Sequence, residues 1–166
     1  GGVGLSLSRE IIVAHIPRFA LPVSYAVFPL SSATSQSFGS GRISVDTDNN
    51  WFRLEPGAVY LLESSVFLYR PTDNTGALES ARVKVQRVDD LLAASPVYTD
   101  ALEAPSVYLK SADQGHPGVT GGMRAIMDLR GSATPAAFVF AGKSSNNKDT
   151  DSEYAEWTSV KIERIG

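Results

Sequence analysis

Short runs of β-branched and aromatic residues recur along the chain, and glycine, proline, asparagine or aspartate closes most of them. In the clearest run, residues 81–86, apolar Ala and Val alternate with Arg82, Lys84 and Gln86, which is the period of a strand with one buried face. No helical period extends beyond two turns, and a single helical turn is expected only at 89–94. The pattern predicts an all-β fold, an antiparallel sandwich, jelly roll or barrel of about eight to ten strands.

The predicted strands are separated by loops rich in turn-forming residues. A Ser-rich loop ends at Ser40, and a Gly/His/Pro loop spans 112–122. The strands are expected at 10–16, 23–28, 42–45, 51–54, 58–70, 81–86, 97–98, 107–109, 123–129, 136–141 and 157–165.

The composition is that of one domain with its own core, since the chain has 166 residues and 43% of them are hydrophobic. Residues 1–9 are expected to form a flexible arm and residues 10–166 the domain. The net charge is −3, with acids and bases mixed along the chain, which argues against the concentrated basic surface of a nucleic-acid binder. The absence of cysteine excludes the usual zinc motifs and thiol nucleophiles. No apolar run approaches the length that spans a membrane.

Two of the predicted strands are apolar on both faces. In 59–69, Tyr60 and Leu62 lie on one face and Phe67 on the other, and in 136–141 Phe138 and Phe140 alternate with Ala and Val. An antiparallel strand with one wet face should alternate with polar residues. At ~25 cal/mol per Å² of apolar surface, three or four such side chains left in water would forgo several kcal/mol. Either a long loop or another subunit must cover the second face, and these five residues are the candidates for an oligomer interface.

Few side chains suited to acid–base chemistry are present. His15 lies in a β run beside apolar residues, which favours a structural role. His116 lies in an exposed turn whose Gly and Pro residues are explained by the turn itself, so a ligand contact is the weaker interpretation. No G-x-S-x-G nucleophile elbow occurs. We therefore expect no catalytic residue and no cofactor.

The two tryptophans bear on a weaker alternative, a polysaccharide-active enzyme on a β-sandwich. Carbohydrate sites display aromatic rings on polar faces, whereas Trp51 and Trp157 each begin a predicted strand. Packing at the rim or in the core is expected for both. Glycoside hydrolysis needs two carboxylates at a set separation, and sequence alone does not give that separation.

Two acidic segments share part of the calcium-loop pattern. Asp46-x-Asp48-x-Asn50 places oxygen ligands at alternating positions. An EF-hand also needs Gly at the sixth position and Glu at the twelfth, where this chain has Trp51 and Gly57. The segment 147–151 fails in the same way. Both are predicted to be solvated turns and no metal ligand is assigned, with a loose surface calcium site as the alternative.

The stretch 51–62 resembles a signature of tumour-necrosis-factor-like and complement-type globular domains. The matching residues are Phe52-x-Leu54, Gly57 and Tyr60-x-Leu62. In such a domain Gly57 would make the turn of a hairpin, and Phe52 and Tyr60 would pack its paired strands. The segment 157–165 is similar to the last strand of the same domains. The resemblance implies a jelly roll that forms a homotrimer, with an aromatic-rich sheet buried at the threefold axis.

Domains of this kind also occur on bacteriophage virions. The resulting hypothesis is a capsid decoration (cement) protein at the capsid surface, which binds the major capsid protein or other virion proteins as a homotrimer. The arm would supply the contacts Leu5, Leu7 and Arg9. The alternative is a receptor-binding tip of a head or tail fibre, whose loops 46–50, 113–120 and 144–151 contact a host glycan or protein. No nucleic-acid or membrane partner is expected.

Overall fold

The computed structural model describes residues 9–69, 79–101, 107–111, 118–144 and 154–166. The described residues form strands, turns and bends and contain no helix, hence none long and apolar enough to cross a bilayer. The strands, in chain order, are β1 (Ile11–Ile16), β2 (Phe19–Ala20), β3 (Ala26–Val27), β4 (Thr34–Phe38), β5 (Ile43–Asp46), β6 (Trp51–Leu54), β7 (Val59–Tyr69), β8 (Glu79–Val88), β9 (Tyr98–Asp100), β10 (Val107–Ser111), β11 (Gly118–Asp128), β12 (Ala136–Ser144) and β13 (Tyr154–Arg164).

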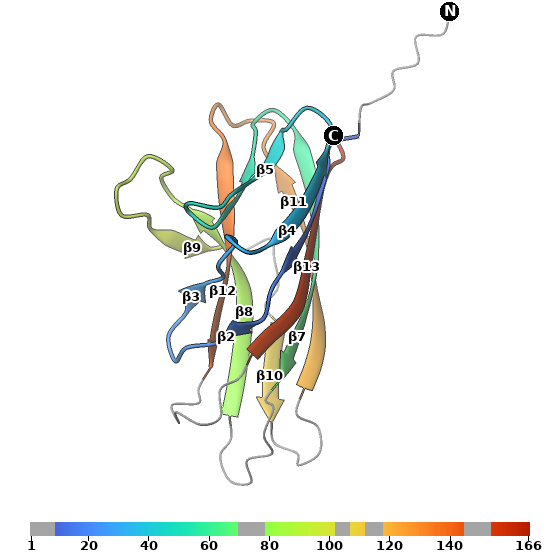
Figure 1. The fold of residues 1–166 in the computed structure, drawn as a ribbon. Coiled ribbons are helices and arrows are strands. Elements are labelled where there is room, and N and C mark those ends of the chain that lie inside the picture. Colours follow the sequence, from blue (N-terminus) through green and yellow to red (C-terminus); the bar gives the residue numbers. More distant parts are fainter. Residues whose placement is uncertain (1–8, 70–78, 102–106, 112–117, 145–153) are drawn as a thin grey trace, which may run out of the picture.

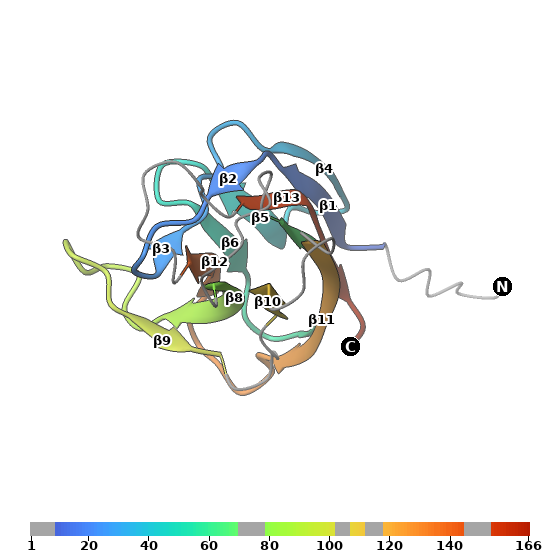
Figure 2. The same cartoon turned by 90° about the horizontal axis from the view of Figure 1, so that it is seen from below.

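The strands form two antiparallel sheets that face each other (Figures 1 and 2). Sheet A has the order β11-β7-β13-β1-β4, with β2 paired to β13. Sheet B has the order β10-β8-β12-β6-β5, with β3 paired to β12 and β9 to β8. Consecutive strands repeatedly change sheet, as β6, β7 and β8 do. The architecture confirms the predicted antiparallel jelly-roll sandwich.

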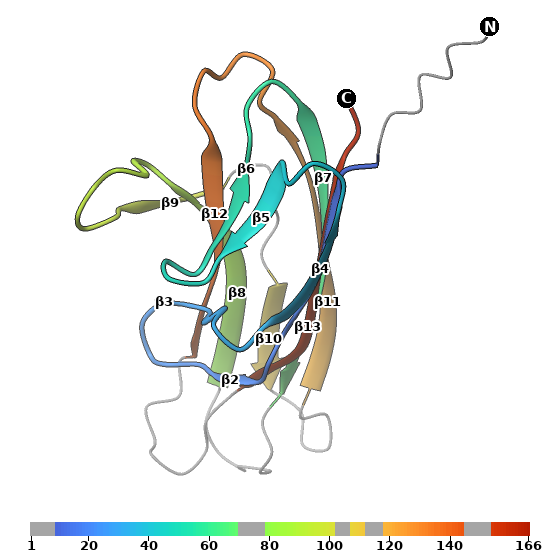
Figure 3. The ribbon, with the colours of Figure 1, turned by 45° about the horizontal axis from the view of Figure 1, so that its top comes forward.

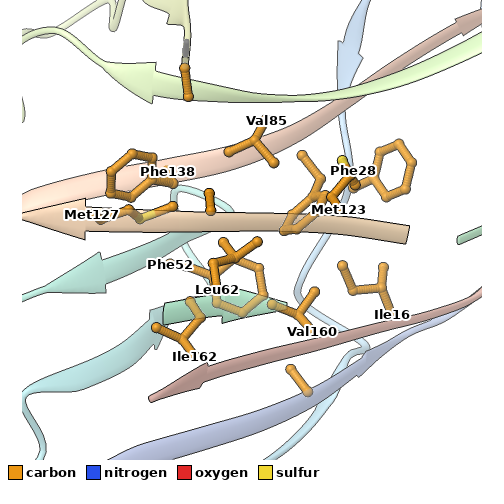
Figure 4. Packing of buried hydrophobic residues seen from close by; sticks show 14 of the residues in the cluster. Ile16, Phe28, Phe52, Leu62, Val85, Met123, Met127, Phe138, Val160 and Ile162 are labelled. Atoms are coloured by element: carbon orange, nitrogen blue, oxygen red, sulfur yellow. The ribbon is translucent and has the colours of Figure 1, made fainter. Parts of the chain in front are cut away.

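The core lies between the two sheets and follows the period of two in β7. The side chains of Tyr60 and Leu62 point inward and are fully buried, whereas their outward neighbours are only half-buried. Phe52, Phe138 and other apolar residues fill the space from the opposite sheet (Figure 4). Phe52 and Phe140 meet edge to face, with ring centroids 5.8 Å apart, a geometry that aromatic pairs prefer.

The signature at 51–62 does not form the predicted hairpin. β6 belongs to sheet B and β7 to sheet A, so the two strands are not paired. Gly57 does make the turn, with a φ of 82° that suits glycine, and the Tyr60 hydroxyl donates a hydrogen bond of 2.6 Å to the Glu55 carbonyl. The segment is therefore a corner that carries the chain from one sheet to the other, and it buries Phe52 and Tyr60 from opposite sides of the core.

The second face of β12 is covered by other segments of the same chain. Its outward residues Ala137 and Val139 are fully buried. Trp51, Val88, Val27, Leu91 and Tyr98 pack with them as a separate small cluster. The segment 89–97 that contributes to this cover is not the predicted helical turn: it is a chain of turns that leads into β9 (Figure 1). For this strand the loop explanation is correct, and no subunit is needed to cover it.

The sequence missed strands at the edges of the sheets. β4 lies within the predicted Ser-rich loop, and β11 begins at Gly118, inside the predicted loop 112–122. All five side chains of β4 are exposed, so this strand, which lies at the edge of sheet A beside β1, contributes nothing to the core. Without a buried face there is no apolar alternation to recognise.

Candidate functional site: the outer face of sheet A

The outer face of sheet A carries a row of mostly apolar side chains across the strands, interrupted by one carboxylate on β13. Residues opposite each other in an antiparallel pair share a face, and the register aligns Phe38, Ile11, Glu163, Leu61 and Ile126 from β4 to β11. Phe38 is 51% exposed and Ile126 is 58% exposed. Two large apolar side chains thus stand in water on a sheet face whose opposite side is the filled core.

The next row on this face is charged. Lys161 on β13, Glu63 on β7 and Arg124 on β11 are directly opposite one another in the register. One acid therefore lies between two bases. A row with both signs can pair with charges of either sign on a contacting surface.

Towards the other end of the face, β13 contains a β-bulge at Trp157. The register with β7 shifts between Glu156 and Ser159, and Trp157 has a φ of 50°, which is unusual for a bulky side chain. The bulge places Glu156 and Trp157 consecutively on the outer side, between the buried residues Ala155 and Thr158. The indole is 72% exposed. Bulges redirect side chains in this manner and are enriched near binding sites.

The exposed indole belongs to an aromatic cluster, defined as Phe67, Tyr69, Tyr154 and Trp157. Trp157 stacks on Phe67 with ring centroids 5.3 Å apart, and Phe67 stacks on Tyr69 at the same distance. The ring centroids of Tyr69 and Tyr154 are 5.8 Å apart. The guanidinium carbon of Arg18 lies 3.7 Å from the centroid of Tyr154, a cation–π contact. The pKa of Tyr69 is raised, mainly by burial and also by its hydrogen bond to Glu156.

A groove of about 470 Å³ lies beside this cluster, where β1 and β13 meet the segment before β4. We call it the Trp157 groove. Pro17 and Ile16 contribute apolar surface. Thr158 is also a lining residue, but its hydroxyl is buried from solvent and has no hydrogen-bond partner among the described residues. The remaining polar side chains that line it are His15, Arg18, Ser32, Thr34, Glu156 and Ser159.

A second groove, of about 510 Å³, lies on the side of sheet B. It is formed by the segment after β8 and the segment before β12, with Arg53, Arg87 and Asp89 among its polar residues. Leu92 beside it is 95% exposed. Two of its acids already cap local structure: Asp89 accepts a hydrogen bond from Thr99, and Asp90 accepts one from the Leu92 amide.

The structure corrects most of the predicted oligomer-interface residues. Tyr60, Leu62, Phe138 and Phe140 are at most 1% exposed, because they point inward and the opposite sheet of the same chain covers them. They are core residues and not a contact surface. Phe67 alone lies on the outer face, half-buried in the aromatic cluster.

The other predicted residues are placed as follows. Arg9 is exposed, with its Nε 3.3 Å from a carboxylate oxygen of Glu163, whereas Leu5, Leu7, His116 and the segment 147–151 lie outside the described residues. Trp51 is buried as expected, but its counterpart Trp157 is not. His15 faces outward on β1 and is exposed, and its structural role stays a prediction.

The segment 46–50 has the geometry of a capped turn. The Asp46 carboxylate accepts hydrogen bonds from the amides of Asp48 and Asn49, both 3.1 Å long, and from the Asn49 side chain at 2.8 Å. These bonds, led by that of the Asn49 side chain, lower the pKa of Asp46. Its oxygens thus serve the turn. In the described part of the chain, no group of three or more His, Cys, Asp or Glu side chains converges in a way that could hold a metal ion.

Comparison with known proteins supports the fold and nothing finer. No family model matches the chain, and no curated protein sequence matches it. Among solved structures, 122 chains match. One of them is the tumour necrosis factor Eiger from S. frugiperda, with a TM-score of 0.53 and 8% identity over 95% of this chain and 94% of that one. The chain therefore has the jelly-roll fold of the tumour-necrosis-factor-like proteins.

Proposed function

We propose that this chain is a structural protein of a bacteriophage virion, a capsid decoration protein that binds the head surface as a homotrimer and stabilises it. The observation that supports assembly is the outer face of sheet A. Its exposed Ile126 and half-buried Leu61 are neighbours in the register, and apolar side chains arranged in this way favour contact with another surface.

A second copy of the chain is the occupant that this face fits best. Beside the apolar row, Glu63 lies between Lys161 and Arg124, so this face offers both an acid and bases to the surface of a neighbouring copy. In a ring of three identical subunits each interface joins two different patches of the same chain, and a row with both signs can pair with either sign on the patch that it meets. The trimer is the form implied by the resemblance to tumour-necrosis-factor-like domains.

Binding to purified phage heads that lack this chain tests the proposal. The wild-type protein is expected to bind them at saturable copy number and to raise their melting temperature. Ile126→Asp puts a charge into the apolar row of sheet A and is expected to weaken both assembly and head binding. Leu92→Asp is the matched control, since Leu92 is 95% exposed on the sheet B side. Equal behaviour of the two variants, or no head binding by the wild type, would contradict the proposal.

A receptor-binding tip of a phage fibre is the second candidate function. The exposed Trp157 beside a polar groove favours it, because binding sites for small ligands combine apolar surface with a few placed polar groups. Adhesion of the purified protein to host cells, or protection of those cells from infection, would favour the tip over the decoration protein. Head binding without adhesion would favour the reverse.

A further inference from the structure

We propose that the Trp157 groove is a carbohydrate-binding site, in which one pyranose ring of a neutral sugar stacks on the indole of Trp157. The site lies where β1 and β13 run side by side, in the sheet whose strands β4, β7, β11 and β13 are labelled on the right of Figure 3. It does not depend on the decoration role, because a virion protein of either kind can carry a glycan site.

The indole of Trp157 is held in place by a stacked neighbour and is otherwise open. Phe67 stacks on one side of Trp157 at an interplanar angle of 24°, while 72% of the residue is open to solvent. The bulge keeps the ring out of the core at the cost of an unfavourable φ of 50°. A rigid, flat and exposed aromatic surface is suited to the apolar C–H face of a sugar ring.

Residues with hydroxyl side chains line the groove beside the indole. Ser32, Thr34 and Ser159 present hydroxyl groups in the groove, and each hydroxyl can both donate and accept hydrogen bonds. The Thr158 hydroxyl is not counted among them, because it is buried from solvent and its side chain lies on the inward side of β13 with Ala155 and Val160. The groove therefore offers the three hydroxyls of Ser32, Thr34 and Ser159 to the hydroxyl groups of a sugar.

The formal charges of the side chains that line the groove are balanced. Arg18 and Glu156 give the groove one cation and one anion. Both are held in place, Arg18 against the ring of Tyr154 and Glu156 by its hydrogen bond with Tyr69. Balanced charge favours a neutral sugar over an acidic one. Among the described residues that line the groove, Glu156 is the only carboxylate, and hydrolysis normally needs two, so binding without cleavage is expected.

A volume of about 470 Å³ is within the range of small-ligand pockets. The contrary explanation of the exposed indole is contact with a second copy of the chain, since Trp157 lies on the same face as the apolar row. That explanation predicts a change of molecular mass when Trp157 is replaced, whereas the sugar site predicts a change of sugar affinity alone.

The test uses the full chain titrated with galactose, glucose, mannose and N-acetylglucosamine, in a calorimeter and by tryptophan emission. The chain has two tryptophans, of which Trp51 is buried and Trp157 exposed, so the emission of Trp51→Phe reports on Trp157 alone. At least one of these sugars is expected to give a saturable signal. Trp157→Ala should weaken that binding about tenfold or more, and Ser159→Ala should weaken it by a smaller factor.

Phe38→Ala, on the same face but outside the groove, is the matched control and should bind the sugar as the wild type does. Each variant is checked for folding by far-UV circular dichroism and for mass by light scattering. No saturable signal with any of the four sugars, equal affinity in Trp157→Ala, or loss of assembly in Trp157→Ala would overturn the proposal. Because head binding and assembly are measured on the same variants, failure of the sugar site would be distinguishable from failure of the decoration role.

Discussion

The backbone at Trp157 predicts an unusual order of stability for two substitutions. The residue has a φ of 50°, and this region costs a residue with a Cβ roughly 1–2 kcal/mol, whereas glycine adopts it freely. The side chain is 72% exposed, so its main contact is the stack on Phe67. Such an aromatic pair contributes about 0.5–1.5 kcal/mol.

Trp157→Ala removes the stack and keeps the backbone strain, so it should lower the free energy of unfolding by about 0.5–1.5 kcal/mol. Trp157→Gly removes the same stack but also relieves the strain. Part of that relief, about 0.4–1 kcal/mol, is offset by the greater freedom of glycine in the unfolded chain. The Gly variant should therefore be more stable than the Ala variant by about 1 kcal/mol.

Urea denaturation followed by far-UV circular dichroism at one protein concentration measures this difference, provided that the slopes of the two variants agree. Arg87 serves as the control position: it is exposed on β8, and its φ is not among the positive values. There the Gly variant should be less stable than the Ala variant. If the Ala variant at position 157 equals or exceeds the Gly variant, the indole is not held in a strained conformation and the argument built on the bulge fails.

Two further substitutions test how the strands are joined. Glu10 is 3% exposed and accepts hydrogen bonds from the Ser40 hydroxyl at 2.6 Å and the Ser40 amide at 2.9 Å, which lower its pKa below the ordinary 4.5. A carboxylate with a lowered pKa stabilises the fold at pH values above its unfolded pKa of 4.5, and this stabilisation is lost as the pH falls through the folded pKa. The difference in unfolding free energy between wild type and Glu10→Gln, measured by urea denaturation at several pH values, should therefore be full at neutral pH and shrink below pH 4.5. A difference that does not depend on pH would contradict this. Gly142→Ala places a Cβ 2.6 Å from Leu21 and 2.9 Å from Phe28 and should cost about 1–3 kcal/mol by overpacking; an unchanged melting temperature would show that these neighbours yield freely.

The sequence was most informative where burial imposes a period. In β7 the inward residues follow a strict alternation, and the same alternation marked residues 81–86 within β8. The double-sided apolar pattern of β12 correctly indicated a covered second face. It could not indicate which segment supplies the cover, because Trp51, Leu91 and Tyr98 come together only in the folded chain.

The candidate site was the part that the sequence concealed. Ala155 and Thr158 are both buried although they are three residues apart, so the period of two is broken between them and the outward residue Trp157 could not be placed by counting. A glycine at the bulged position is one local sequence signal of a β-bulge, and residues 156–159 contain no glycine. The groove is lined by residues of β1 and β13 together with residues 32 and 34. These segments are brought together by the order of strands in the sheet, which the sequence of any single segment does not reveal.

The central claim is that the outer face of sheet A joins copies of this chain into a trimer, and the mass in solution tests it most directly. Sedimentation equilibrium of the wild-type protein over a range of micromolar concentrations is predicted to give three times the protomer mass of 17.7 kDa, and the mass of Ile126→Asp is predicted to fall towards that of one protomer. A wild-type protein that sediments as a single 17.7 kDa species throughout the range would contradict the account.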